Sequence, residues 1–172
     1  MAPKIYFKHF LFDSPKTHEF YEAIGRNVVV WGRFEATMDD AILRIMHHRA
    51  ALSAPQVVPT SFKKKIDLWK RLFKTEPMVQ GCREDALKMA SDALTLFKRR
   101  NELIHASIDS FTDDAPAKAL RFEHKQDGET YLHAFEVGTE SLSKLLDDTR
   151  ALYSALSRSA MHTLLGSLAP PD

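Results

Sequence analysis

The sequence contains little cysteine and glycine, and it has no long apolar run. Its single cysteine, Cys82, excludes a disulfide framework and a cysteine-rich zinc module, and is typical of a reducing compartment. Six glycines in 172 residues are too few for the frequent turns of an all-β sandwich. No apolar run approaches the roughly 18 residues that a membrane span requires. Lys8 and His9 interrupt the segment where a secretion signal would be apolar. We therefore expect a soluble, cytoplasmic protein with no membrane partner.

The chain also lacks an excess of charge of either sign. Its net charge of +1 excludes a strongly basic nucleic-acid coat, although it leaves room for a local basic patch. Apolar residues make up 44% and charged residues 27%, which is the balance of a folded globular protein. A length of 172 residues suits one domain with a substantial core. We expect residues 1–172 to form a single helical domain.

Apolar residues recur at helical spacing over most of the chain. This periodicity predicts four helices, over about 17–49, 61–74, 83–108 and 139–168. In the first of them, Asn27 lies within the apolar stripe and Glu35 lies at its edge. The aromatic residues before this helix, within 1–16, form an N-terminal arm that we expect to cover the bundle.

The periodicity changes from helical to alternating between residues 118 and 137. Asp127-Gly128 separates two alternating segments, which is a strong signal for a β-hairpin. A turn at these two residues predicts the pairs Leu120–Phe135, Phe122–His133 and His124–Tyr131, all on one apolar face. The predicted fold is therefore mainly α, a four-to-five-helix bundle with a small β-hairpin inserted before the last helix.

The third predicted helix carries a polar residue in its apolar stripe. The stripe runs through Asn101, and Arg100 and His105 border it on either side. A buried amide without a hydrogen bond costs about 1–3 kcal/mol, so a helix that only packed would have an apolar residue there. We infer that Asn101 serves the structure or a site.

The segment from Arg100 to His105, Arg-Asn-Glu-Leu-Ile-His, resembles the Arg-polar-x-x-x-His signature of HEPN domains (higher eukaryote and prokaryote nucleotide-binding). Arg99 fits the signature as well, because the family pattern tolerates one more residue before the histidine. The motif lies late on a long helix, after two helices and before a final one, as in the family. The segment 31–39, which contains Glu35, looks like the first helix of several HEPN subfamilies, in which an acidic residue faces the site.

The resemblance implies a metal-independent endoribonuclease of HEPN type, with no cofactor and no metal ligands, in a toxin–antitoxin or phage-defence system. RNA, a second copy of the chain, and an antitoxin or sensor protein are the partners it implies. It implies that Arg100 binds the phosphate, that His105 transfers protons, and that Asn101 orients the substrate or His105. Glu35 would support the site from the first helix.

These residue types suit cleavage of RNA by its own 2′-hydroxyl. A histidine exchanges protons near neutral pH, and an arginine stays charged and can bind two phosphate oxygens. Arg100 and His105 are five residues apart, about 140° around an ideal helix. They converge if the helix distorts, or if a two-fold dimer brings two motifs into one cleft. HEPN nucleases resemble the second case, so we expect a homodimer through the 83–108 helix with the motif near its axis.

Basic residues beside the motif and on the second predicted helix are candidates for RNA binding. They are Lys98, Arg99, Lys70 and Arg71. For such a stripe the general alternative is a solvated helix face. Two alternatives to the nuclease remain open: a catalytically silent HEPN-like module that binds RNA or a protein, and a helical scaffold without a site.

Other histidine patterns are weaker candidates for chemistry. Glu102-x-x-His105 matches half of a di-iron motif, but the chain has no second half. His47 and His48 are adjacent, about 100° apart on a helix, and badly placed to share a metal ion. His124 and His133 stand beside aromatic residues, where packing is the default role.

Overall fold

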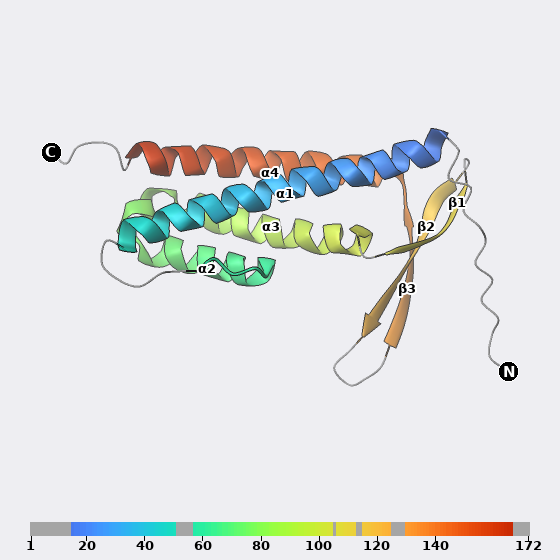
Figure 1. The fold of residues 1–172 in the computed structure, drawn as a ribbon, viewed down its shortest axis with the longest axis horizontal. Helices are drawn as coiled ribbons and strands as arrows, with labels where there is room; N and C mark the ends of the chain where they lie inside the picture. The colour runs from blue at the N-terminus through green and yellow to red at the C-terminus, as the bar shows by residue number, and fades with distance from the viewer. Residues whose placement is uncertain (1–14, 51–56, 105, 113–114, 125–129, 167–172) are drawn as a thin grey trace.

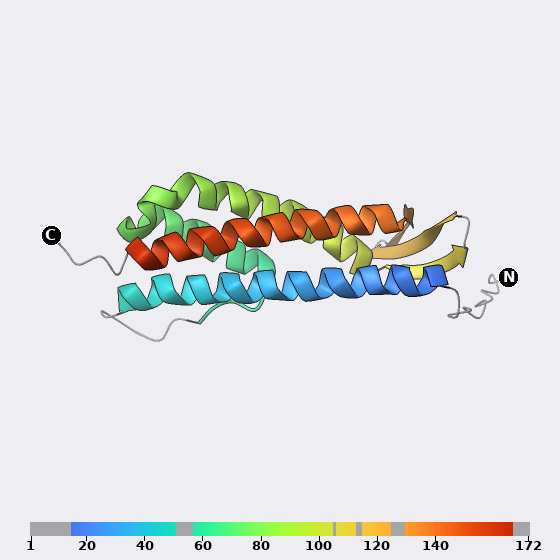
Figure 2. The same cartoon turned by 90° about the horizontal axis from the view of Figure 1, so that it is seen from above.

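The helices form an elongated bundle with a small sheet at one end (Figure 1). The computed structural model describes residues 15–50, 57–104, 106–112, 115–124 and 130–166. The helices are α1 (Pro15–Ala50), α2 (Phe62–Thr75), the short 3₁₀ helix η1 (Pro77–Cys82), α3 (Arg83–Ile104) and α4 (Thr139–Gly166). α1 and α4 lie side by side and run in the same direction, whereas α3 runs the opposite way (Figures 1 and 2).

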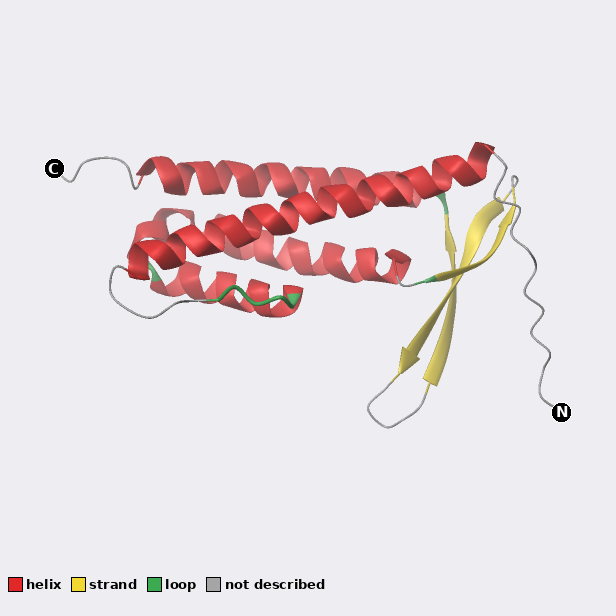
Figure 3. Ribbon diagram, in the orientation of Figure 1, coloured by secondary structure: helices red, strands yellow, loops and turns green. Residues whose placement is uncertain are grey.

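Three antiparallel strands cap the end of the bundle at which α1 and α4 begin (Figure 3). They are β1 (Ser107–Thr112), β2 (Ala115–His124) and β3 (Thr130–Val137), in the order β1-β2-β3. A mainly helical fold with four main helices and an antiparallel hairpin before the last one is thus confirmed. The sheet is larger than predicted, because a third strand, β1, pairs with the β2–β3 hairpin, and the periodicity did not reveal this strand.

The third helix is shorter than predicted, because it ends at Ile104 and not at Ile108. Ile108 lies in β1 and pairs with Ala119 of β2. There it packs against a small apolar cluster between the sheet and the helices. The spacing from Ile104 to Ile108 fits a helix, but pairing with β2 overrides this local pattern.

The predicted pairing of β2 with β3 is wrong by one residue. Leu120 pairs with Ala134, Phe122 with Leu132 and His124 with Thr130. Five residues, 125–129, separate His124 from Thr130, whereas a turn centred on Asp127-Gly128 requires an even number. This dipeptide lies outside the described residues. Because side chains alternate along a strand, the shift moves β2's other face to the core.

The core-facing side of the sheet consists of small and apolar residues. Ala117, Ala119 and Val137 are buried together with Phe20 of α1 and Leu142 of α4. Phe135 packs against them, as its place on the predicted apolar face of β3 implied. On β2 the alanines, not the larger Leu120, turn inward. The sheet is therefore held against the first turns of α1 and α4.

The main core lies between the four helices, and the predicted stripes of α1 and α4 are confirmed. The buried members of these two stripes are Phe20, Trp31, Phe34, Met38, Ile42 and Ile45 of α1, and Leu142, Leu145, Thr149, Leu152 and Leu156 of α4. Asn27, in the α1 stripe, is buried too, and its amide donates to the carbonyl of Leu142 at 3.0 Å. This bond ties α1 to the first turn of α4.

The buried face of α3 is rotated from the predicted stripe through Asn101. Ala86, Ala90, Ala93 and Leu96 are buried, whereas Leu94 and Phe97, which precede Asn101 at helical spacing, are only partly buried. Alanines dominate this face, which lets α3 approach its neighbours closely. Asn101 is half-buried in consequence, not enclosed as its place in the stripe implied.

Candidate functional site

The motif lies at the end of α3 that approaches α1. Phe97, one turn before Asn101, packs against Trp31 of α1 with ring centroids 6.1 Å apart. Leu103, two residues after Asn101, packs against the small apolar cluster that contains Phe20, as does Ile24 of α1. The views in Figures 1 and 2 agree that this end of α3 lies beside α1. Arg100 and Asn101 therefore lie level with the part of α1 between Ile24 and Trp31.

Arg100 is half-buried and carries unused hydrogen-bonding capacity. One of its terminal nitrogens donates to Oδ1 of Asn101 at 3.0 Å. Its Nε is buried and has no hydrogen-bond partner in the described structure. Within that same part of the chain, Arg100 makes no ion pair with a carboxylate. An unpaired buried donor costs about 1–3 kcal/mol, and more when the group is charged. An anion placed at Arg100 would remove this penalty.

Arg99, the neighbouring arginine, differs from Arg100 because it forms an ion pair. Its guanidinium forms an ion pair with Asp148 of α4 at 3.1 Å, and both side chains are a little over one-third exposed. The positive charge of Arg99 is thus matched by an acid, whereas that of Arg100 is not. Of the two arginines that fit the signature, Arg99 is therefore the one held by a carboxylate in the described structure, and Arg100 is the one that is not.

His105 lies outside the described residues, immediately after the end of α3. Its proposed role in proton transfer rests on the sequence alone. Glu102, the other ionisable residue of the motif, is exposed on α3.

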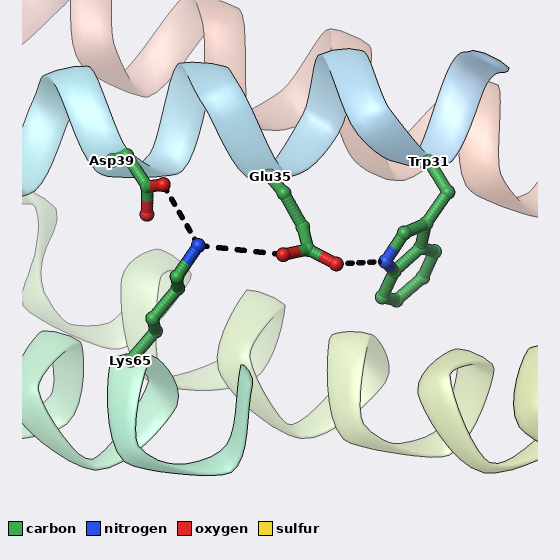
Figure 4. Close-up of polar contacts among 4 residues, drawn as sticks. All are labelled: Trp31, Glu35, Asp39 and Lys65. Atoms are coloured by element: carbon green, nitrogen blue, oxygen red, sulfur yellow. Dashed lines mark hydrogen bonds and ion pairs between the residues drawn. The ribbon is translucent and has the colours of Figure 1, made fainter. Parts of the chain in front are cut away.

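Glu35 belongs to a separate polar cluster between α1 and α2 (Figure 4). One oxygen of Glu35 accepts a hydrogen bond from the indole nitrogen of Trp31, and the other lies 3.3 Å from Nζ of Lys65. Nζ of Lys65 also lies 2.7 Å from Asp39. In the described structure, Glu35 forms no hydrogen bond or ion pair with Arg100 or Asn101. Trp31 is its indirect link to α3, through the packing of the indole on Phe97.

Lys65 was not singled out by the sequence analysis, although it is the centre of this cluster. Its side chain is 8% exposed and faces two carboxylates of α1. The signal was available in the spacing, because Lys65 comes three residues after Phe62 and four before Trp69, both buried. A lysine at that spacing lies on the core side of α2, where a charge requires a partner.

The basic residues predicted to bind RNA are not gathered in one place. Lys98 is exposed, nearly two turns before the end of α3. Lys70 and Arg71 lie towards the other end of the bundle, since the neighbouring Trp69 donates to the carbonyl of Ala86. Fourteen residues of helix, about 21 Å, separate that level from Arg100.

The exposed lysines nearest the motif on α2 are instead Lys63 and Lys64, at the helix start. Their neighbour Phe62 stacks on Phe97 with ring centroids 4.7 Å apart. A basic surface beside Arg100 would therefore be built from Lys63, Lys64 and Lys98.

A groove of about 760 Å³ lies between α3 and α4, apart from the motif. Met89, Leu96 and Leu152 contribute apolar lining, and the Arg99–Asp148 pair lies at its margin. Arg100 and Asn101 do not line it.

Two further classes of site are absent from the part of the chain that the structure describes. No group of three or more His, Cys, Asp or Glu side chains there could hold a metal ion. No helix in the same part is both long and apolar enough to cross a membrane.

Comparison with known proteins gives no assignment for this chain. No protein-family model, no curated protein and no solved structure matches it.

Proposed function

We propose that this chain is a metal-independent endoribonuclease of HEPN type, which cleaves RNA through attack of the 2′-hydroxyl. The observation that supports this proposal best is the incomplete hydrogen bonding of the Arg100 guanidinium. It is a half-buried arginine with an unpaired buried donor and no acidic partner in the described structure. A phosphate diester would supply the missing acceptors and the missing negative charge.

In the proposed reaction, the 2′-oxygen attacks the adjacent phosphorus and the bond from phosphorus to the 5′-oxygen breaks. His105 takes the proton from the 2′-hydroxyl, and a protonated His105 of a second copy gives a proton to the leaving 5′-oxygen. Arg100 stabilises the charge on the phosphorane oxygens. The products are a 2′,3′-cyclic phosphate and a 5′-hydroxyl, so no metal or external nucleophile is required.

Asn101 has a more specific role in this proposal than the sequence alone gave it. Its Oδ1 accepts a hydrogen bond from Arg100, so the amide orients the guanidinium. We therefore treat Asn101 as a positioning residue that acts through Arg100. Lys98, Lys63 and Lys64 would attract the RNA backbone to the same end of α3.

A catalytically silent RNA-binding or protein-binding module is the second candidate. The position of Glu35 favours it, because this acid is engaged by Lys65 and Trp31 and not by the motif. Such a module would bind RNA through Arg100 and leave it intact.

Incubation of purified protein with total RNA, with and without EDTA, separates the two candidates. The nuclease proposal predicts cleavage that EDTA does not stop. Binding of RNA without cleavage would support the silent module.

A further inference from the structure

In the part of the chain that the structure describes, four arginines are half-buried, and only two of them are bonded to another element. Arg83 donates to two backbone carbonyls at the end of α2, and Arg99 forms an ion pair with a carboxylate of α4. Arg100 donates only within α3, and Arg121 of β2 forms no hydrogen bond or ion pair within the described residues. Partial burial of a cation without an acceptor is unfavourable. The described fold therefore leaves Arg100 and Arg121 without the partner that each requires.

The register of the sheet places Arg121 on the side that faces the bundle. Ala119 is fully buried against the helices, and side chains alternate along a strand, so Arg121 lies on the same face. On β3, Phe135 packs against the apolar cluster there, and His133 follows it on that face, opposite Arg121. Lys118, from the alternate set of positions on β2, is exposed on the outer face. Arg121 thus continues the core-facing side of the sheet beyond its apolar part.

The same register places Arg121 beside the end of α3. Ser107, the first residue of β1, pairs with Leu120. Because the strands are antiparallel, Arg121 is level with Ala106, the residue before Ser107. Ala106, and Leu103 from the last turn of α3, both pack against the apolar cluster of the sheet. The views in Figures 1 and 2 agree that the end of α3 lies beside the sheet.

Arg100 lies on the part of α3 that extends past the start of α2. α2 begins at Phe62, which stacks on Phe97, so the last turns of α3 continue beyond the first residue of α2 towards the sheet (Figure 1). Arg100 is four residues before the end of α3, about 6 Å along its axis. The two arginines therefore approach one region from different elements, between the start of α2 and the β2–β3 hairpin.

We propose that Arg121 binds the RNA backbone together with Arg100, so that the core-facing side of the β2–β3 hairpin forms part of the nuclease site. This assignment rests on the proposed function. Two cations that approach each other repel, and an anion at each of them removes both the repulsion and the lack of acceptors. An RNA strand carries one phosphate per nucleotide, so a single strand supplies both anions.

The two arginines have different roles in this assignment. Arg100 stabilises the phosphate that reacts, whereas Arg121 binds another phosphate of the same strand. A cation on the hairpin therefore fixes the direction in which the RNA crosses the end of α3. Its interaction is the same before and during the reaction, so its loss should raise KM and leave kcat nearly unchanged.

Binding of RNA by the full chain tests the assignment. The probe is a short, fluorescein-labelled 2′-O-methyl RNA of random sequence, which lacks the nucleophile and stays intact, and fluorescence anisotropy is measured over a range of salt concentrations. Arg121→Gln removes the charge and keeps much of the side-chain length. It should raise the dissociation constant at least about fivefold and reduce the salt slope by about 0.7, as loss of one phosphate contact to a single strand implies.

Two further variants control for effects on the fold and on overall charge. Arg121→Lys restores the charge and should restore most of the binding. Lys118→Gln removes one charge from the outer face of the same strand and should bind like wild type. Circular dichroism and thermal unfolding show whether each variant is folded. Cleavage of unmodified RNA by the same proteins then gives KM and kcat.

Arg121→Gln with the affinity and salt slope of wild type would overturn the assignment, and the cleavage measured for wild type would still support the nuclease. Equal weakening by Lys118→Gln, or no rescue by Arg121→Lys, would also overturn it, since overall charge or the fold would then explain the loss. A wild-type protein that binds RNA through Arg121 but never cleaves it would support the assignment and refute the nuclease. A wild-type protein without affinity for RNA would overturn both.

Discussion

At the scale of single residues, the molecule contains two kinds of buried polar group. Asn27 and Lys65 are enclosed and join helices, Asn27 through its amide nitrogen alone, because its Oδ1 has no partner in the described structure. Arg100 is half-buried and incompletely satisfied, because its Nε has no partner in the described structure. The first kind joins helices, whereas the side chain of Arg100 makes no hydrogen bond beyond α3 in the described structure, and the proposed function assigns it an anion as partner.

Lys65→Met should destabilise the protein by about 1–3 kcal/mol, because Glu35 and Asp39 lose the cation that links them. Both carboxylates are partly exposed, and water will compensate for part of the loss. The adjacent and exposed Lys64 provides the control, since Lys64→Met should change stability by less than about 0.5 kcal/mol. Urea denaturation of both variants measures the difference, and equal stabilities would show that the cluster is not a clamp between α1 and α2.

Two asparagines in apolar stripes should respond oppositely to the same substitution. Asn27→Leu should cost about 1–3 kcal/mol, because the carbonyl of Leu142 loses its bond and a larger side chain must fit. Asn101→Leu should leave stability nearly unchanged and impair cleavage, because Asn101 bonds only Arg100 in the described structure. Thermal unfolding and an RNA cleavage assay check the pair. A large loss of stability in Asn101→Leu would make Asn101 structural.

At the scale of elements, the periodicity of apolar residues predicts which face of a helix is buried. It does not predict features that depend on the pairing of strands. The predicted apolar stripes of α1 and α4 are buried as expected, because each of these helices faces a continuous core. The end of α3 and the existence of β1 depend on pairing with β2, which no local spacing reveals. The pairing of β2 with β3 depends on the length of the connection between them, and a one-residue shift reverses the faces.

The motif from Arg100 to His105 also has features that the sequence predicts and features that depend on tertiary packing. Its place late on the third helix and the exposure of Lys98 could be predicted from the sequence. That Arg99 is paired with Asp148 could not, because the acid comes from a helix about fifty residues away. Nor could the engagement of Glu35 by Lys65 be seen without the packing of α2 on α1.

The observed pairing of the strands predicts which β2 residues tolerate a charge. Ala119 is fully buried against α1 and α4, so Ala119→Asp should cost about 2–4 kcal/mol or prevent folding. Lys118 is exposed, so Lys118→Asp should cost at most about 1 kcal/mol, from repulsion by Glu136, its partner on β3. Thermal unfolding of both variants tests this. If Lys118→Asp is the more damaging change, the described pairing is wrong.

At the scale of the whole molecule, the bundle holds the end of α3, where the proposed site lies, in a fixed position. The aromatic packing of Trp31, Phe62 and Phe97 fixes the last turns of α3 against α1 and α2. The sheet closes the same end of the bundle, where α1 and α4 begin. The proposed site therefore lies on an element held from two sides, as positioning of a phosphate would require.

Reaction chemistry offers a test that does not depend on any variant. If the 2′-hydroxyl is the nucleophile, an RNA with a single 2′-deoxy nucleotide at the cleavage position should resist, and EDTA should have no effect on the parent RNA. The cut RNA should carry a 2′,3′-cyclic phosphate, which mass spectrometry identifies. Cleavage of the deoxy substrate, or dependence on a metal ion, would exclude this mechanism.

The comparison of the two neighbouring arginines tests the central claim most directly. Cleavage of total RNA is measured for wild type, Arg100→Ala, Arg100→Lys and Arg99→Ala, after circular dichroism has shown that each is folded. Arg100→Ala and Arg100→Lys should each lose at least about a hundredfold in rate, since an ammonium lacks the planar fork of the guanidinium. Arg99→Ala, whose charge is already matched by Asp148, should retain most of the activity. Full activity in Arg100→Ala, or a loss confined to Arg99→Ala, would contradict the account.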